Sequence, residues 1–176
     1  REDARGALGV ARSLNPDLPR VRLEEGRLLA ATGEREAAVG VLRELVAAHP
    51  AQAEAWDLLG DLRRLEGELE AAEQAYAQAI EHRELGGEAR WKRALVRIGR
   101  GDLEGARQDV AALEERASQG PRLPYLQGIL SFREGNLDAA AGHFQQVLDR
   151  QNAFLPARYY LGAIHYRQGR PNQAEA

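Results

Sequence analysis

The 176-residue chain has no cysteine and no methionine, and it contains only three serines and one threonine. Without cysteine it has no disulfide framework, no zinc–thiolate site and no thiol nucleophile. It also lacks any apolar run near the roughly 18–20 residues that a membrane-spanning helix needs. With 44% hydrophobic and 29% charged residues, the composition excludes a disordered chain and predicts a folded protein.

A strong excess of positive charge is also missing, because 27 acidic residues outnumber 24 basic ones and the net charge is −3. The sequence pI of about 5.9 argues against a general nucleic-acid binder, which presents a strongly basic face. The charge is uneven along the chain. Residues 1–86 have a net charge of −6, whereas residues 87–176 have a net charge of +3.

Glycine and alanine recur at a fixed 34-residue period, which is the main signal in the sequence. Two columns of the repeat hold one residue type throughout, a glycine and, further along each unit, an alanine: Gly33, Gly67, Gly101, Gly135 and Gly169, and Ala38, Ala72, Ala106, Ala140 and Ala174. A third column holds only small residues: Gly26, Gly60, Ala94, Gly128 and Gly162. A fixed period of this length indicates a solenoid of stacked supersecondary units.

Each 34-residue unit reads as two amphipathic helices, because apolar residues recur at helical spacing twice within a unit such as 53–86. The glycine of the first column fits the residue after the first helix, where a left-handed backbone suits a residue without Cβ. Asp102 and Asn136 follow that glycine and are predicted N-caps of the second helix. Gly60 and Ala72 are predicted where the paired helices cross, because larger side chains would separate the helix axes.

These columns resemble the pattern of the tetratricopeptide repeat family, which the unit 53–86 carries with Trp56, Leu59, Gly60, Gly67, Ala72, Tyr76 and Ala79. The resemblance implies an all-α fold, an α-solenoid of antiparallel helix pairs that forms a right-handed superhelix. It makes 1–176 a single solenoid segment with the second helix of a preceding unit (1–18), four complete units (19–52, 53–86, 87–120 and 121–154) and the start of a further unit (155–176). Because both ends fall inside repeats, we expect the segment to belong to a longer chain.

No residue pattern in the sequence indicates catalysis or a metal site. The four histidines, His49, His82, His143 and His165, are too far apart in the sequence to form the paired ligands of a helical metal site. The serines lack a nucleophile-elbow context. The tripeptide Arg100-Gly101-Asp102 is explained by the turn of the repeat rather than by adhesion. We therefore predict a protein that is not an enzyme and needs no cofactor.

Binding is predicted instead on the first helices of the units. In the resembled family these helices line a concave groove with the second, fifth, ninth, twelfth and thirteenth residues of each unit. Carried over to the second half of this chain, these places predict an aromatic and aliphatic stripe with basic edges, formed by Trp91, Lys92, Leu95, Ile98, Tyr125, Ile129, Phe132, Arg133, Tyr159, Tyr166 and Arg167. The alternative is that these residues only pack the first helices of neighbouring units together.

The ninth place favours the groove interpretation. The family prefers a polar residue there, and its carboxylate-clamp members need asparagine, whereas this chain has Leu95 and Ile129. An exposed apolar strip of this kind would be an interaction site. The missing asparagine argues against capture of an acidic chaperone C-terminus.

The leading prediction is a non-catalytic scaffold that binds another protein or a peptide segment along this groove. A second candidate is a bacterial cell-envelope protein that takes part in exopolysaccharide assembly or export and contacts anionic polysaccharide or its export machinery. Residues 123–148 and 155–176 resemble exported tetratricopeptide lipoproteins of exopolysaccharide and exosortase systems. A third is a passive spacer with an empty groove. The second candidate places the chain in the periplasm or cell envelope, with the cytoplasm as the alternative. Neither nucleic-acid binding nor membrane insertion is predicted for this segment.

Overall fold

The computed structural model describes residues 17–83, 86–115 and 120–170, together with residues 6, 9, 10, 13 and 15. Over these residues the chain is helical and contains no strand, which confirms the predicted all-α class. The helices are α2 (Pro19–Thr32), α3 (Arg35–Ala48), α4 (Ala53–Leu65), α5 (Leu69–Glu81), α6 (Gly87–Arg100), α7 (Leu103–Glu114), α8 (Arg122–Glu134), α9 (Leu137–Arg150) and α10 (Leu155–Arg167). The helix predicted within 1–18 and the one predicted to begin near 174 lie largely or wholly outside the described residues.

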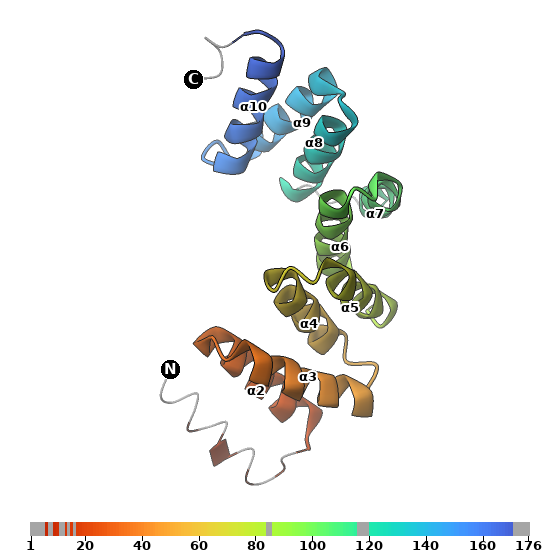
Figure 1. The fold of residues 1–176 in the computed structure, drawn as a ribbon, viewed down its shortest axis with the longest axis vertical. Coiled ribbons are helices and arrows are strands. Elements are labelled where there is room, and N and C mark those ends of the chain that lie inside the picture. The colour runs from red at the N-terminus through yellow and green to blue at the C-terminus, as the bar shows by residue number, and fades with distance from the viewer. Residues whose placement is uncertain are drawn as a thin grey trace. The chain divides into compact units, whose positions relative to one another are not determined.

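The chain divides into two compact units, Arg1–Ala89 and Arg90–Ala176. The first contains α2 to α5, and the second contains α7 to α10 together with α6 from Arg90 onward. Within each unit the helices follow one another as antiparallel pairs joined by short turns (Figure 1). Each unit has its own cluster of buried apolar side chains.

The glycine column ends the first helix of each pair. Its members all have a left-handed backbone, with φ values between 72° and 88°: Gly33, Gly67, Gly101, Gly135 and Gly169. At the first of these turns the Gly33 N–H donates to the Ala30 carbonyl at 3.3 Å, and the Glu34 N–H donates to the Leu29 carbonyl at 2.9 Å. Because glycine alone adopts this backbone without strain, the role predicted for the column is confirmed.

The second helices begin directly after these turns. Asp102 caps α7 as predicted, because its Oδ1 accepts a hydrogen bond from the Gly105 N–H at 2.9 Å. Asn136 is the N-cap residue of α9, as predicted, but its side chain makes no capping bond, and its Nδ2 instead donates to Glu134 Oε2 at 3.4 Å. An amide can donate to a neighbouring carboxylate, whereas the Asp102 carboxylate can only accept.

Small residues occupy the crossing of the paired helices, as the sequence predicted. A Cβ added at Gly60 would lie 2.5 Å from Tyr76 Cε1, and a Cβ at Gly128 would lie 2.7 Å from Phe144 Cε1. Both rings are fully buried, so neither can retreat. The glycines therefore allow the large side chain of the second helix to reach the backbone of the first.

A buried hydroxyl in the first unit is satisfied by a neighbouring helix. The Tyr76 hydroxyl on α5 donates to Asp61 Oδ1 on α4 at 2.8 Å. Burial raises the pKa of Tyr76 well above its ordinary value, and the Asp61 carboxylate acts in the same direction. The neutral phenol therefore stays a hydrogen-bond donor at every physiological pH.

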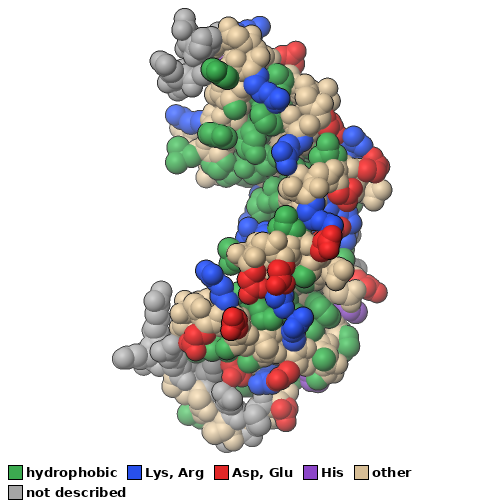
Figure 2. Space-filling view, viewed as in Figure 1, with side chains coloured by type: hydrophobic (Ala, Val, Ile, Leu, Met, Phe, Trp, Pro, Cys, Tyr) green, Lys and Arg blue, Asp and Glu red, His purple; other side chains and the backbone are tan. Residues whose placement is uncertain are grey.

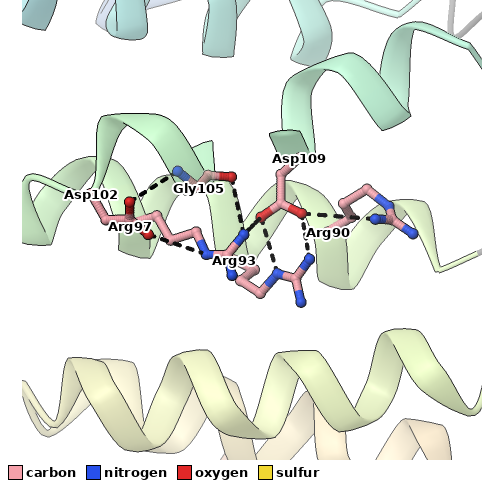
Figure 3. Close-up of polar contacts among 6 residues, drawn as sticks. All are labelled: Arg90, Arg93, Arg97, Asp102, Gly105 and Asp109. Carbon is pink, nitrogen blue, oxygen red and sulfur yellow. Dashed lines mark hydrogen bonds and ion pairs between the residues drawn. The ribbon is translucent and has the colours of Figure 1, made fainter. Parts of the chain in front are cut away.

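In the second unit, α6 and α7 are joined by an ion-pair cluster around Asp109, which is fully buried (Figure 3). Arg93 holds both carboxylate oxygens, with Nε 3.0 Å from Oδ2 and Nη2 2.5 Å from Oδ1. Arg97 Nη1 donates to Oδ2 at 3.0 Å, and Arg90 Nη1 lies 3.8 Å from Oδ1. A buried carboxylate needs such partners, because removing a charge from water without pairing is costly.

At the equivalent positions of the repeat, the first unit has mostly apolar side chains in place of this ion-pair cluster. Arg90, Arg93 and Arg97 come one repeat after Trp56, Leu59 and Arg63, and Asp109 comes one repeat after Ala75. Leu59 and Ala75 are both buried. The same places of the repeat are therefore filled by apolar packing in one unit and by ion pairs in the other.

Candidate functional site

The aromatic side chains of the second unit gather where α10 packs on α8 and α9. Tyr125 meets Phe154 edge to face with ring centroids 5.0 Å apart, and Phe132 meets Tyr160 in the same way at 5.3 Å. The Tyr160 ring also stacks on the buried Phe144, with centroids 4.8 Å apart. Such pairs stabilise a contact beyond the area they bury. They fix the orientation of α10 and so decide which of its side chains face solvent.

A second set of α10 side chains faces solvent and forms the α10 stripe, defined by Leu155, Tyr159 and Tyr166. They are 74%, 75% and 75% exposed. At about 100° per residue, the three directions fall within roughly 40° of one another around the helix, so the side chains form one line along it. Hydrophobic side chains also gather over the α8–α10 part of the second unit in Figure 2. Aligned, exposed apolar side chains of this size make the stripe a candidate interaction surface.

Basic side chains lie on α10 beside the stripe and at the end of α8. The Arg167 guanidinium lies over the Phe132 ring, 5.1 Å from its centroid. Arg133 Nη2 donates to a backbone carbonyl near the end of α6 at 3.2 Å, and Arg158 Nε donates to a backbone carbonyl before α10 at 3.1 Å. Within the part of the chain that the structure describes, none of these three guanidinium groups pairs with a carboxylate. Their charge is therefore available to a ligand.

The side chains predicted for the site differ in exposure. Arg133, Tyr159, Tyr166 and Arg167 are exposed, Trp91, Lys92, Leu95, Tyr125 and Phe132 are half-buried, and Ile98 and Ile129 are buried. The half-buried aromatics are partly covered by neighbours, as Trp91 is by the Arg122 guanidinium 5.3 Å from its ring centroid. The exposed members lie on α10 and at the end of α8.

Ile98 and Ile129 differ from the groove expectation. They are 3% and 5% exposed and belong to the core of the second unit, among residues such as Leu126 and Phe144. Leu95, at the same place of the repeat as Ile129, packs against that core and is half-buried. Apolar side chains at this place gain free energy by leaving water for a neighbouring helix. The isoleucines are therefore not part of the candidate surface.

Two features were not predicted from the sequence. Leu155 extends the α10 stripe, and its signal is the helical spacing that aligns it with Tyr159 and Tyr166. In the first unit, α3, α4 and α5 line an open cleft of about 700 Å³, whose lining includes Trp56 and Leu59. The alanines that leave room for this cleft are Ala47, Ala71, Ala75 and Ala77.

In the described ranges, no three His, Asp or Glu side chains are grouped so as to hold a metal ion. The helices described there are also too short or too polar to cross a bilayer.

Comparison with known protein families identifies these repeats. One family model, described as tetratricopeptide repeat, matches residues 23–83 and 66–121, and a second with the same description matches residues 131–176. The chain belongs to the tetratricopeptide repeat family. No match was found among curated proteins.

Solved structures share the fold of this tetratricopeptide repeat protein at low sequence identity. A chain of the APC/C hetero-tetramer Cut9–Hcn1 aligns over 98% of this chain with a TM-score of 0.85 and 16% identity, although the match covers only 34% of that chain. A tetratricopeptide repeat protein from Parabacteroides merdae aligns over 97% of this chain and 68% of its own, with a TM-score of 0.84 and 18% identity. YrrB, described as having an unusual peptide-binding site, aligns over 96% and 87%, with a TM-score of 0.76 and 17% identity. The fold is that of a helical repeat scaffold for protein interactions.

Proposed function

We propose that this tetratricopeptide repeat protein is a non-catalytic scaffold that binds a protein or peptide segment through the α8–α10 surface. The observation that carries the proposal is the α10 stripe, with Leu155, Tyr159 and Tyr166 each about three-quarters exposed. Three large, aligned and exposed apolar side chains make this helix face a candidate interaction surface. The peptide-binding site named for YrrB supports a peptide as the kind of ligand.

The tyrosines are suited to act as anchors. Each has an apolar ring that gains free energy on burial and a hydroxyl that can remain at the wet rim of an interface. A few such side chains usually dominate a binding free energy. Because α10 is already fixed by the Tyr125–Phe154 and Phe144–Tyr160 contacts, the stripe is presented on a rigid element, which lowers the entropic cost of binding.

The first prediction concerns these anchors. Peptides selected from a displayed library on the wild-type protein should bind the Tyr159→Ala/Tyr166→Ala variant about tenfold to a hundredfold more weakly, as expected for the loss of buried aromatic anchors. Fluorescence anisotropy with labelled copies of the selected peptides measures the change.

The matched control is Leu65→Ala, which removes an exposed apolar side chain from α4 in the first unit. It should leave the affinity unchanged. Circular dichroism should show the same helicity for all variants, because the mutated side chains lie in solvent. Equal affinity of the wild type and the double tyrosine variant would falsify the proposal. The exopolysaccharide role stays a prediction, and an anionic polysaccharide that displaces the peptides in a tyrosine-dependent way would favour it.

A further inference from the structure

The first unit contains the cleft that α3, α4 and α5 line, which we call the α4 cleft. Its volume of about 700 Å³ lies in the range of small-molecule sites in proteins. Helix α2 precedes and α6 follows these three helices in the sequence, and each repeat of a solenoid contacts only its sequence neighbours. The α4 cleft is therefore a feature of the inner repeats, and no helix of a further repeat is expected to fill it.

The apolar lining of the α4 cleft is not a requirement of the repeat. Val46 from α3 and Leu59 from α4 both line the cleft. Two repeats further on, their places hold Glu114 and Gln127. There Gln127 Nε2 donates to Glu114 Oε1 at 2.6 Å. The first unit therefore has apolar side chains where the second unit has a hydrogen-bonded pair, and a concave apolar lining suits the apolar part of a ligand.

The lining changes from aromatic to charged along α4. Trp56 lines the cleft near the start of the helix, and its Nε1 donates to the Pro50 carbonyl at 2.8 Å, which holds the ring in place. Arg63 lines the cleft seven residues later, about 10 Å further along the helix axis. Its Nη1 lies 2.9 Å from Glu66 Oε2 and 2.8 Å from Glu68 Oε2. The charge of Arg63 is therefore already balanced by carboxylates of the protein.

Arg43 brings an unpaired positive charge to the α4 cleft. It lines the cleft from α3 and is exposed, and within the described part of the chain its guanidinium has neither a hydrogen bond nor an ion pair. None of the described side chains that line the cleft is acidic. An unpaired guanidinium can hold a carboxylate through two parallel hydrogen bonds. Arg63 offers no second such place, because Glu66 and Glu68 together exceed its charge, so the cleft suits a ligand with one negative charge.

We infer that the α4 cleft binds an amphipathic carboxylate of the size of a medium-chain fatty acid. Its apolar part lies against Trp56 and Leu59, and its carboxylate accepts hydrogen bonds from Arg43. This site is separate from the α8–α10 surface and does not depend on the proposed function. A peptide is the less suitable occupant, because the cleft has the volume of a small-molecule site, whereas a stable protein interface buries roughly 1,200–2,000 Å².

The test uses the fluorescence of Trp56. The chain has two tryptophans, and Trp91 belongs to the second unit, so the Trp91→Phe protein reports on the α4 cleft alone. Decanoate, decanol and decyltrimethylammonium are titrated below the concentrations at which they form micelles. We expect decanoate to shift the Trp56 emission and to bind about tenfold more tightly than decanol, with the ammonium compound weaker still. Each methylene removed from the carboxylate should weaken binding about twofold to fourfold.

Two variants of this protein separate the charge from the space. Arg43→Gln should abolish the preference for decanoate over decanol and leave the affinity for decanol unchanged. Ala47→Leu/Ala71→Leu places larger side chains in the lining and should weaken all three ligands more than tenfold. The matched control Ala37→Leu adds the same side chain on the exposed face of α3, outside the lining, and should change nothing. Circular dichroism checks that each variant keeps the helicity of its parent.

Several results would overturn the inference. One is an emission that stays constant up to about 1 mM decanoate. Another is a decanoate affinity that neither Arg43→Gln nor the cleft-filling variant changes, which is the behaviour of unspecific adsorption. Equal affinities for decanoate and decanol would remove the carboxylate from the proposal. A library-selected peptide that the cleft-filling variant loses, and that decanoate does not displace, would make a peptide the occupant. The peptide affinities that depend on Tyr159 and Tyr166 are measured separately, so this inference and the proposed function can fail independently.

Discussion

Asp109 holds guanidinium groups of α6 against α7 from a fully buried position. Its two oxygens accept from Arg93 and Arg97, so both oxygens of the carboxylate are used. A buried ion pair is weak evidence for stability as such, because desolvation offsets much of the attraction. Removing Asp109 is different, because the partly buried Arg93 and Arg97 then lose their closest carboxylate, and Arg97 keeps Asp102 only at 3.7 Å.

The cluster predicts a strong coupling between two residues. Asp109→Ala alone should lower the free energy of unfolding by about 3 kcal/mol, because it leaves Arg93 and Arg97 without their carboxylate. Asp109→Ala combined with Arg93→Leu recreates the Leu59–Ala75 combination of the first unit. The double variant should recover a large part of the loss. Urea denaturation of both variants measures the coupling, and additive losses would show that the cluster is not a unit.

His143 predicts a dependence of stability on pH. Its Nδ1 is buried and has no hydrogen-bond partner among the described residues. Burial lowers the pKa of His143, although Glu114 acts in the opposite direction. The unfolded chain therefore binds the proton more readily, so stability is full above a pH of about 6.5 and falls as the pH drops below that value.

The measurement is the melting temperature between about pH 7.5 and pH 5. The wild type should lose more over this range than His143→Ala, which removes the titrating group. His82→Ala, at an exposed position, should behave like the wild type. Parallel curves for the wild type and His143→Ala would remove His143 as the cause.

At the scale of the helix, the helix pairs could be predicted from the sequence because the residues that form the turns and the helix crossings act through near neighbours. The left-handed glycines and the small residues at the crossings have the same neighbours in every unit, so their roles follow from spacing alone. Asn136 begins α9 as predicted but makes no side-chain capping bond, and its amide nitrogen donates to Glu134. That contact depends on one nearby side chain, which the repeat pattern does not encode.

Alanine substitutions at two glycines of the first unit test whether the helix crossing needs a residue without a side chain. A Cβ at Gly26 would lie 2.7 Å from Cδ2 of the buried Leu42, whereas a Cβ at Gly40 on the exposed face of α3 would have no neighbour within 4 Å. Gly26→Ala should destabilise the protein by about 1–3 kcal/mol through overpacking. Gly40→Ala should stabilise it by about 0.5–1 kcal/mol through helix propensity. Urea denaturation gives both values, and the same sign for both variants would contradict the close crossing.

At the scale of the whole molecule, exposure depends on which helix comes next. Tyr125 and Tyr159 occupy the same place in consecutive units, yet Tyr125 is covered by Phe154 whereas Tyr159 is 75% exposed. Sequence reasoning placed both in one stripe, because a repeat pattern assigns the same face to both. It placed Ile98 and Ile129 there as well, although both lie in the core. The fold was therefore predictable from the period, whereas the accessible part of the site needed the contacts between helices.

Because the repeat has a constant period, each position of the unit can be compared directly between units, and some positions carry different residues in each one. One place on the second helix is filled in turn by Val41, Ala75, Asp109 and His143, which are aliphatic, small, anionic and titratable. Each sits on the same scaffold, with different neighbours supplied by the preceding helix. The residues that form the turn and the helix crossing are therefore constant, whereas other positions vary. Transferring a side chain to the same position of the next unit would test whether its partners must be transferred with it. Engineering of this protein can begin from exchanges that the chain already contains.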